Sequence, residues 1–261
     1  MMDIINIITS TVERSETVKD VHYMDDTDLL GLVEDRRKLY YSIKRVMDII
    51  LSSVFLILIS PAFALIGLGI IIYSPGPIFF KQVRIGARRI IQGEKVFWKK
   101  QQFTCYKFRT MKVNSDSKIH EAYIEALINE NKEKMTELQG GTSEIRKLVG
   151  DPRVTRPGKL LRKFSLDELP QFWNVLRGDM SLVGPRPAIP YEVDMYKLWY
   201  IHRLEAQPGI TGLQQVTARC TASFEEQVKL DIEYIKRQSI WLDLLIMIKT
   251  PFVILSTKGA E

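Results

Sequence analysis

The chain has 261 residues, of which 46% are hydrophobic and 26% charged, and its formal net charge at neutral pH is +6. This balance is typical of a folded globular protein and excludes a disordered or low-complexity chain. The positive charge favours an anionic partner, which could be nucleic acid, acidic phospholipid or a charged substrate, and composition alone does not choose among these.

The two cysteines, Cys105 and Cys220, are far apart in sequence and have no histidine at a metal-ligand spacing. Because they form no CxxC pattern, we expect free thiols in a reducing compartment. Residues 1–20 lack the basic start of a cleavable secretory signal. The sequence therefore predicts a folded domain that stays in the cytoplasm.

Residues 1–40 form the first predicted region, a polar N-terminal extension. Acids at positions 25, 26 and 28 are followed by a basic run at 36–38, and the apolar residues show only weak periodicity. These properties are typical of a mobile or peripheral segment.

Residues 41–76 form the second region, a membrane element. Its centre, residues 49–73, carries no charge and, at about 1.5 Å per residue, is long enough to cross the hydrocarbon core of a bilayer. Basic residues flank it on both sides, so a spanning helix would place one basic flank outside, against the positive-inside tendency. Pro61 removes a helical hydrogen bond, and Ser60 can satisfy freed backbone groups. These features favour a re-entrant helix broken at Ser60-Pro61; an ordinary spanning helix with a proline kink is the alternative.

Residues 77–261 form the third region, a cytoplasmic domain of the α+β class that is mostly helical. Residues 78–86 and 96–111 have the composition of strands, and a polar loop over 86–93 would join them into a small β-hairpin. The periodicity predicts a helix over 115–138 and a C-terminal helix over 240–255. The C-terminal helix could pack in the core or lie, as an amphipathic interfacial helix, at a membrane surface.

Asp167 and Glu168 are adjacent carboxylates at an expected helix start. Ser165 and Glu168 match a capping box, in which acids only satisfy backbone donors. That register would put Pro170 at the fifth helical position, where its missing N–H costs a hydrogen bond. A helix that begins nearer Asp167 accommodates Pro170 and places both carboxylates beside backbone N–H groups suited to phosphate. One carboxylate could then attack phosphorus while the other holds a divalent cation, for which magnesium is the natural choice.

Basic residues that could bind a phosphate occur in two further motifs. Arg186 lies between two prolines that fix the backbone and aim the guanidinium for a bidentate grip, although a rigid turn with a solvated arginine is equally open. Lys107 and Arg109 alternate with Phe108, so in a strand both would face one side; a solvated strand face is the default interpretation.

The segment from Pro208 to Gly212 has the composition of a turn that needs glycine. Gln214 and Gln215 follow it and could make polar contacts to a substrate. A purely structural turn is the safer interpretation. The three histidines, His22, His120 and His202, form no spacing for metal binding or proton transfer.

Three motifs, SLDELPQFWNVLRGDMSLVGPRP from Ser165, YKFRTM from Tyr106 and PGITGLQQV from Pro208, occur together in this chain. With them the chain resembles the bacterial sugar transferase family, the monotopic polyprenyl-phosphate phosphoglycosyl transferases. The resemblance extends from about Lys44 to the C-terminus. It implies a protein of the bacterial inner membrane whose phosphoglycosyl transferase domain, residues 77–261, faces the cytoplasm.

The resemblance also implies roles for particular residues. Asp167 would attack the β-phosphorus of a UDP-sugar and release UMP, leaving a sugar-phosphate on the enzyme that undecaprenyl phosphate then takes. Glu168, with Asp167, would hold Mg²⁺, and Lys107 and Arg186 would complete the catalytic set. Candidate substrate-binding residues are Arg109, Arg162 and Gln214.

Two other classes of protein compete with the enzyme. A catalytically silent scaffold, anchored in membrane lipids and recruiting glycan enzymes, would not need these charged residues together. A nucleic-acid-binding protein is suggested by charge alone, and the sequence has no recognisable helix-turn-helix or basic-aromatic surface. Nothing in the sequence identifies the sugar, the polysaccharide pathway (exopolysaccharide, capsule or O-antigen) or the oligomeric state, and a homodimer stays open.

Overall fold

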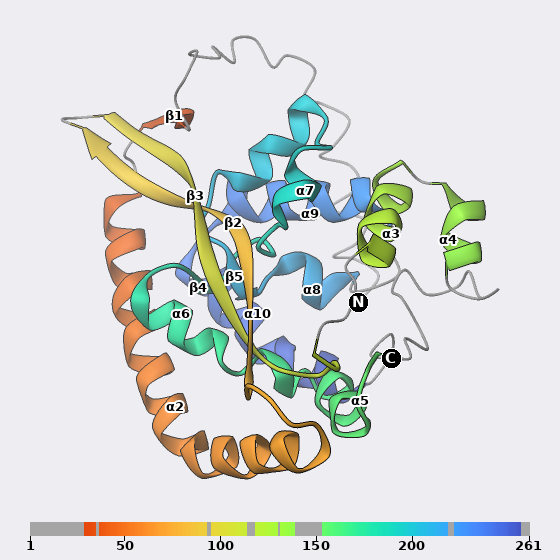
Figure 1. Cartoon of the computed structure of the whole chain (residues 1–261). Coiled ribbons are helices and arrows are strands. Elements are labelled where there is room, and N and C mark those ends of the chain that lie inside the picture. Colours follow the sequence, from red (N-terminus) through yellow and green to blue (C-terminus); the bar gives the residue numbers. More distant parts are fainter. Residues whose placement is uncertain are drawn as a thin grey trace.

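The computed structural model describes residues 29–34, 37–92, 95–113, 118–129, 131–138, 153–218 and 222–256. Predictions about residues 1–28 and Cys220 lie outside this part of the chain. Within it the fold is mostly helical, with one three-stranded antiparallel sheet and one pair of short parallel strands, as Figure 1 shows. The predicted α+β class is confirmed at this level.

Helix α2, Lys38–Tyr73, is a single helix of 36 residues that contains Pro61. The backbone stays helical through Ser60 and Pro61, so the predicted break is a bend and not a gap, and Figure 1 shows the helix turning sharply along its length. Ser60 Oγ donates to the carbonyl of Ile57 at 2.9 Å, as expected where a proline disturbs the ladder. α2 ends at the cluster that follows Tyr73, as the turn residues predict.

Both limbs of α2 pack on the rest of the domain. Arg45 donates to the carbonyls of Val175 and Leu176, at 2.6 and 2.7 Å, and caps the C-terminal end of a short helix there. Beyond the bend, Ile70 joins a small core with Phe108 and Leu161. Much of the apolar surface between these contacts is exposed, and α2 is the one helix of the described chain that is long and apolar enough to cross a membrane.

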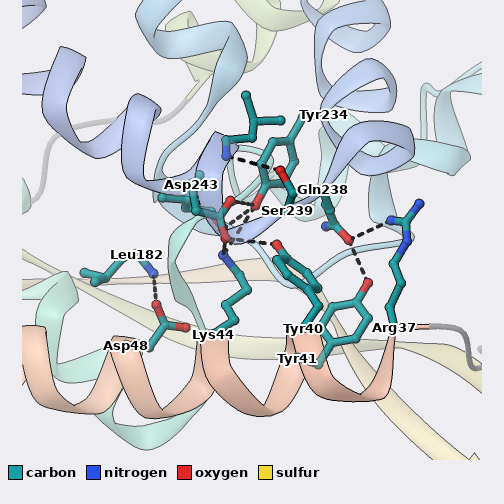
Figure 2. Close-up of polar contacts among 12 residues, drawn as sticks. Arg37, Tyr40, Tyr41, Lys44, Asp48, Leu182, Tyr234, Gln238, Ser239 and Asp243 are labelled. Carbon is teal, nitrogen blue, oxygen red and sulfur yellow. Dashed lines mark hydrogen bonds and ion pairs between the residues drawn. The ribbon is translucent and has the colours of Figure 1, made fainter.

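A polar network joins the first turns of α2 to the C-terminal helices α9, Phe224–Arg237, and α10, Ile240–Leu255 (Figure 2). At its centre Lys44 Nζ lies 2.7 Å from Asp243 Oδ2, and both side chains are buried. The hydroxyls of Tyr40 and Tyr234 also donate to Asp243, at 2.9 and 2.7 Å. The predicted membrane region thus begins with turns that belong to the folded domain.

The sheet has the order β1-β3-β2, with β1 Leu29–Glu34, β2 Phe79–Gln92 and β3 Lys95–Phe108. β2 and β3 pair without interruption from Phe79 opposite Phe108 to Gln92 opposite Lys95. The predicted polar loop over 86–93 is therefore wrong, because apolar partners extend the strands; Ile90, for example, lies opposite Phe97. β1 was expected to be part of a peripheral extension, but it pairs with residues 95–99 and completes the sheet.

The predicted helix over 115–138 is divided into α3, Lys118–Ile128, and α4, Lys132–Leu138. Asn131 explains the division, because its Oδ1 accepts from the backbone N–H of Lys134 at 3.0 Å and starts a new helix. The C-terminal helix is confirmed as α10. One side of α10 buries Asp243 and Ile246, while Trp241, Ile248 and Phe252 on its other sides are exposed, so core packing and an apolar outer surface coexist.

The remaining elements of the described chain are short: α5 Arg156–Lys163, η1 Leu166–Glu168, α6 Gln171–Arg177, β4 Ser181–Val183, α7 Pro190–Val193, η2 Leu198–Leu204, β5 Gly209–Thr211 and α8 Leu213–Thr217. The main core joins the hairpin to α6, β4, α9 and α10. β4 and β5 run parallel and bring two sequence motifs together: a Cβ on Gly209 would lie 2.1 Å from the backbone nitrogen of Gly184. The turn interpretation of the Pro208 segment is wrong, because Gly209–Thr211 is strand β5. Glycine is required at Gly209 by this close approach to Gly184 and not by a turn conformation.

Candidate active site

The two carboxylates lie on η1, between α5 and α6. Ser165 has φ 54° and makes no side-chain cap, so the capping-box interpretation is wrong here. α6 begins at Gln171 with Pro170 just before it, where its missing N–H costs nothing. The N–H groups of Glu168 and Leu169 bond to carbonyls inside the turn, at 3.2 and 3.3 Å, so these two backbone groups do not form the expected anion site.

Side chains supply the positive charge instead. Lys107, near the end of β3, donates to Glu168 Oε1 at 2.6 Å, and both side chains are largely shielded from solvent. Arg186 is exposed although its neighbours Pro185 and Pro187 are buried, so the rigid turn presents its guanidinium. Lys107, Glu168 and Arg186 line one small cavity of about 30 Å³, which the two adjacent strands, η1 and the turn after β4 enclose. The structure thus brings three of the four predicted catalytic residues together.

Burial raises the pKa of Glu168, but the charges of Lys107 and Arg186 and the hydrogen bond from Lys107 outweigh it and lower this pKa to about 2. Glu168 is therefore ionised at any physiological pH. A carboxylate held in this state among cations serves electrostatic positioning better than proton transfer at neutral pH.

Asp167, the fourth predicted catalytic residue, is partly exposed on the same turn. Glu168 lines both described cavities, and Asp167 is outside the lining of either. As the neighbour of Glu168, it lies at the edge of the charged cluster formed by Lys107, Glu168 and Arg186.

The three predicted substrate-binding residues occupy different positions in the structure and have different partners. Arg109 is buried and donates to the carbonyls of Ser74 and Pro75, so it fixes the exit from α2. The strand argument placed it beside Lys107, but β3 ends at Phe108 and the chain turns there. Arg162 donates from Nε to Thr110 Oγ1 at 2.9 Å. Gln214 is buried and lines the larger cavity, as a substrate contact would.

Sequence reasoning missed Arg84, a second buried cation in the cluster. Arg84 lines the small cavity and donates to the carbonyl of Pro187 at 3.0 Å and to Gln82 at 2.7 Å, while its Nε has no partner among the described residues. Burial, and then the charge of Arg186, lower the pKa of Arg84. Its alternation with Gln82 along a strand was visible in the sequence, but only the pairing of β2 with β3 places it beside the motif residues.

The cavity also contains Cys105 and two glutamines. Burial raises the pKa of the Cys105 thiol, which is free, as expected. Gln171 and Gln215 complete the polar lining, and the buried Oε1 of Gln215 has no partner among the described residues. These amides could accept hydrogen bonds from a ligand, or donate hydrogen bonds to it, without adding charge to the cavity.

A larger cavity of about 700 Å³ reaches the same cluster through Glu168 and Arg186. Its size is that of a ligand site. On one side it is lined by apolar residues of α2 and α10, including Leu51, Val54, Leu58, Met247 and Ile254. An anionic group bound at Arg186 could therefore carry a long apolar tail between these two helices.

Comparison with known proteins identifies the family of this chain. Residues 39–257 match the family model of the bacterial sugar transferases, and the chain belongs to this family.

Three relatives illustrate the similarity. The exopolysaccharide production protein ExoY of Rhizobium meliloti is 38% identical over 82% of this chain and 86% of its own length. The undecaprenyl-phosphate galactose phosphotransferase of Salmonella typhimurium is 38% identical over 84% of this chain, and the UDP-glucose:undecaprenyl-phosphate glucose-1-phosphate transferase of Escherichia coli 35% over 95%. The chain spans only 41% and 46% of the lengths of these last two relatives.

Proposed function

We propose that this protein is a phosphoglycosyl transferase that moves a sugar-1-phosphate from a UDP-sugar to undecaprenyl phosphate and releases UMP. The observation that carries the proposal is the position of the charged cluster at the end of an apolar groove between α2 and α10. A diphosphate and a lipid phosphate both need cations, and the lipid also needs an apolar path. The names of the Salmonella and Escherichia relatives include both undecaprenyl phosphate and the transfer of a sugar phosphate.

The reaction would proceed in two displacements on one phosphorus. A carboxylate oxygen of Asp167 attacks the phosphorus that carries the sugar, the bond from this phosphorus to the bridging oxygen breaks, and UMP leaves with the electron pair. An oxygen of undecaprenyl phosphate then attacks the same phosphorus. The Asp167–phosphorus bond breaks, the carboxylate is restored, and the sugar leaves on a polyprenyl diphosphate.

The cluster would stabilise charge in both steps. Arg186 and Lys107 would neutralise the phosphate oxygens, and Arg84 would add a fixed positive charge behind them. Glu168, ionised and held by Lys107, would keep that ammonium group in place.

Magnesium fits the donor set present. Asp167 and Glu168 would hold it, and because Mg²⁺ takes one or two carboxylates together with substrate phosphates, a larger cluster of protein ligands is not required. The low pKa of Glu168 supports this role, since only the ionised carboxylate binds a cation. When bound, Mg²⁺ would supply additional neutralisation of the diphosphate.

The membrane arrangement is part of the proposal. α2 would enter the cytoplasmic leaflet of the inner membrane and return, with the bend near Pro61 at its deepest point. Support comes from the contacts of both limbs with one domain: Lys44 pairs with Asp243 on the first limb, and Ile70 packs on Phe108 on the second. The exposed apolar residues of α10 would face membrane lipids.

The experiment that tests the function measures UMP release by detergent-solubilised protein from a panel of UDP-sugars, with Mg²⁺ and undecaprenyl phosphate each omitted in turn. Sustained UMP release with one donor, dependent on both additions, would support the reaction and identify the sugar. Folded protein that releases no UMP from any donor would instead favour the scaffold alternative.

A further inference from the structure

The larger cavity has a second end that neither the lipid groove nor the charged cluster explains. Its lining there comes from α3, α7, η2 and α9, and Figure 1 shows α3 on the side of the domain opposite the label of α2. Residues at this end include Tyr123, Glu192, Arg203, Phe224 and Gln227. The mixture of aromatic, charged and amide side chains differs from the apolar lining between α2 and α10.

One wall of this end is a rigid polar network around Arg203. Arg203 donates to Glu192 Oε1 at 3.2 Å and to Asp231 Oδ2 at 2.6 Å, and the Tyr196 hydroxyl donates to Glu192 at 2.5 Å. Arg203 is 3% exposed, and its Nε has no partner among the described residues. Arg203 also lines the cavity, so its Nε–H is a donor that an oxygen atom of a ligand could use.

A second wall is formed by α9. Phe224 and Gln227 are three residues apart and lie on one face of the helix with Asp231, four residues further on. Gln227 Nε2 donates to the carbonyl of Ala222 at 3.2 Å, which fixes its amide and uses one of its two N–H groups. The ring of Phe224 is held beneath the Arg203 guanidinium, 5.6 Å away. An amide next to an aromatic ring suits a ligand with polar edges and apolar faces.

The geometry of the two displacements indicates which part of the donor lies here. UMP leaves from the side of phosphorus opposite Asp167, and the acceptor phosphate must approach from that same side to break the bond to Asp167. UMP and the lipid phosphate therefore share one direction, toward the groove between α2 and α10. The sugar stays on phosphorus throughout, so it must extend from phosphorus in a direction other than toward this groove.

We propose that the end of the cavity formed by α3, α7, η2 and α9 is the sugar subsite of the donor, where Gln227, Glu192 and Arg203 contact the hydroxyl or acylamino groups of a hexose. This assignment rests on the proposed function. Because hydrogen-bonding groups discriminate more strongly than apolar walls, these three residues would also determine which sugar is accepted.

The test separates the sugar from the nucleotide. For wild type, Gln227→Leu and Glu192→Gln, KM is measured for the UDP-sugar that the wild type uses best, and Kd is measured for UMP, which lacks the transferred hexose. We expect Gln227→Leu to raise KM about tenfold or more, as expected for a lost polar contact, with the Kd of UMP unchanged. Glu192→Gln should change the relative kcat/KM values across a panel of UDP-hexoses and their N-acetylated analogues.

Matched variants keep the result interpretable. Lys229→Ala changes an exposed residue of the same helix that pairs with Glu225, and it should leave both constants unchanged. Gln227→Glu retains the size of the side chain, and it replaces Gln227→Leu in the test if the leucine variant has a lowered Tm. Equal increases in KM and in the Kd of UMP would assign this end to uridine and overturn the proposal, as would no change in either. If the wild type turns over no donor at all, the proposed function itself has failed.

Discussion

Asp243→Asn removes the negative charge from the buried network that joins α2 to α10 (Figure 2). The side chain of Lys44 is 6% exposed and that of Asp243 is 0% exposed, so neither charge can be solvated by a small movement. Removing one partner of a buried pair costs about 3–5 kcal/mol, because the other charge stays buried and unpaired. The asparagine can still accept one hydrogen bond, and Asp48 lies one turn along α2 from Lys44, so we expect the lower end, about 3 kcal/mol.

The assay is unfolding of the detergent-solubilised protein, followed by circular dichroism. A loss of about 3 kcal/mol corresponds to a fall in Tm of about 6–12 °C for a domain of this size. Replacing both partners, as Lys44→Met with Asp243→Asn, should recover part of the loss because neither charge of this pair remains buried, while Asp48 keeps its hydrogen bond from the Leu182 N–H. Arg237→Gln, which removes an exposed pair with Glu233, is the control and should cost less than about 1 kcal/mol. A single variant within 1 kcal/mol of wild type, or a double variant no better than the single one, would refute this account of the network.

Three further predictions follow from the site and its surroundings. Gly209→Ala should destabilise the protein by more than about 2 kcal/mol, measured by the same unfolding, because its Cβ would meet the backbone of Gly184; an unchanged Tm would show that the strands can separate. Arg186→Lys should lower kcat by about tenfold or more, since an ammonium group does not reproduce a bidentate grip, and equal kcat values would exclude that grip. The hydrogen bond to Glu205 raises the pKa of His202 above 6.5 against the effect of burial, so its stabilisation is complete below pH 6.5 and is lost as pH rises through the raised pKa. His202→Gln should therefore lower stability, by less than about 1 kcal/mol, at pH 6 but not at pH 8.5, and a constant difference would contradict this.

Much of the fold was accessible from the sequence because local chemistry determines it. The apolar run of α2, the turn after Tyr73 and the C-terminal helix all follow from hydropathy and turn residues. The errors concern features that depend on partners distant in sequence. The strands extend through residues 86–92 because apolar residues face each other across the hairpin, and β1 exists because β3 offers it an edge.

The site shows the same division. Motifs identified Glu168, Lys107 and Arg186, and the structure brings them to one cavity. Arg84 and Gln171 were missed because no local pattern distinguishes them from an ordinary strand cation and an ordinary helix amide. Arg109 lies outside the lining of this cavity because the chain leaves β3 at Phe108 and the guanidinium donates to the carbonyl of Ser74, and a period-two pattern cannot show where a strand ends.

The central claim is that the sugar-phosphate passes through Asp167, and a burst experiment tests it most directly. Protein is mixed with its UDP-sugar and Mg²⁺ in the absence of undecaprenyl phosphate, and UMP release and intact protein mass are followed together. The account predicts a single burst of UMP that matches the amount of protein, a mass increase equal to one sugar-phosphate, loss of both in Asp167→Asn, and removal of the added mass when undecaprenyl phosphate is supplied. UMP release that begins only when both substrates are present, with no change in protein mass, would contradict it.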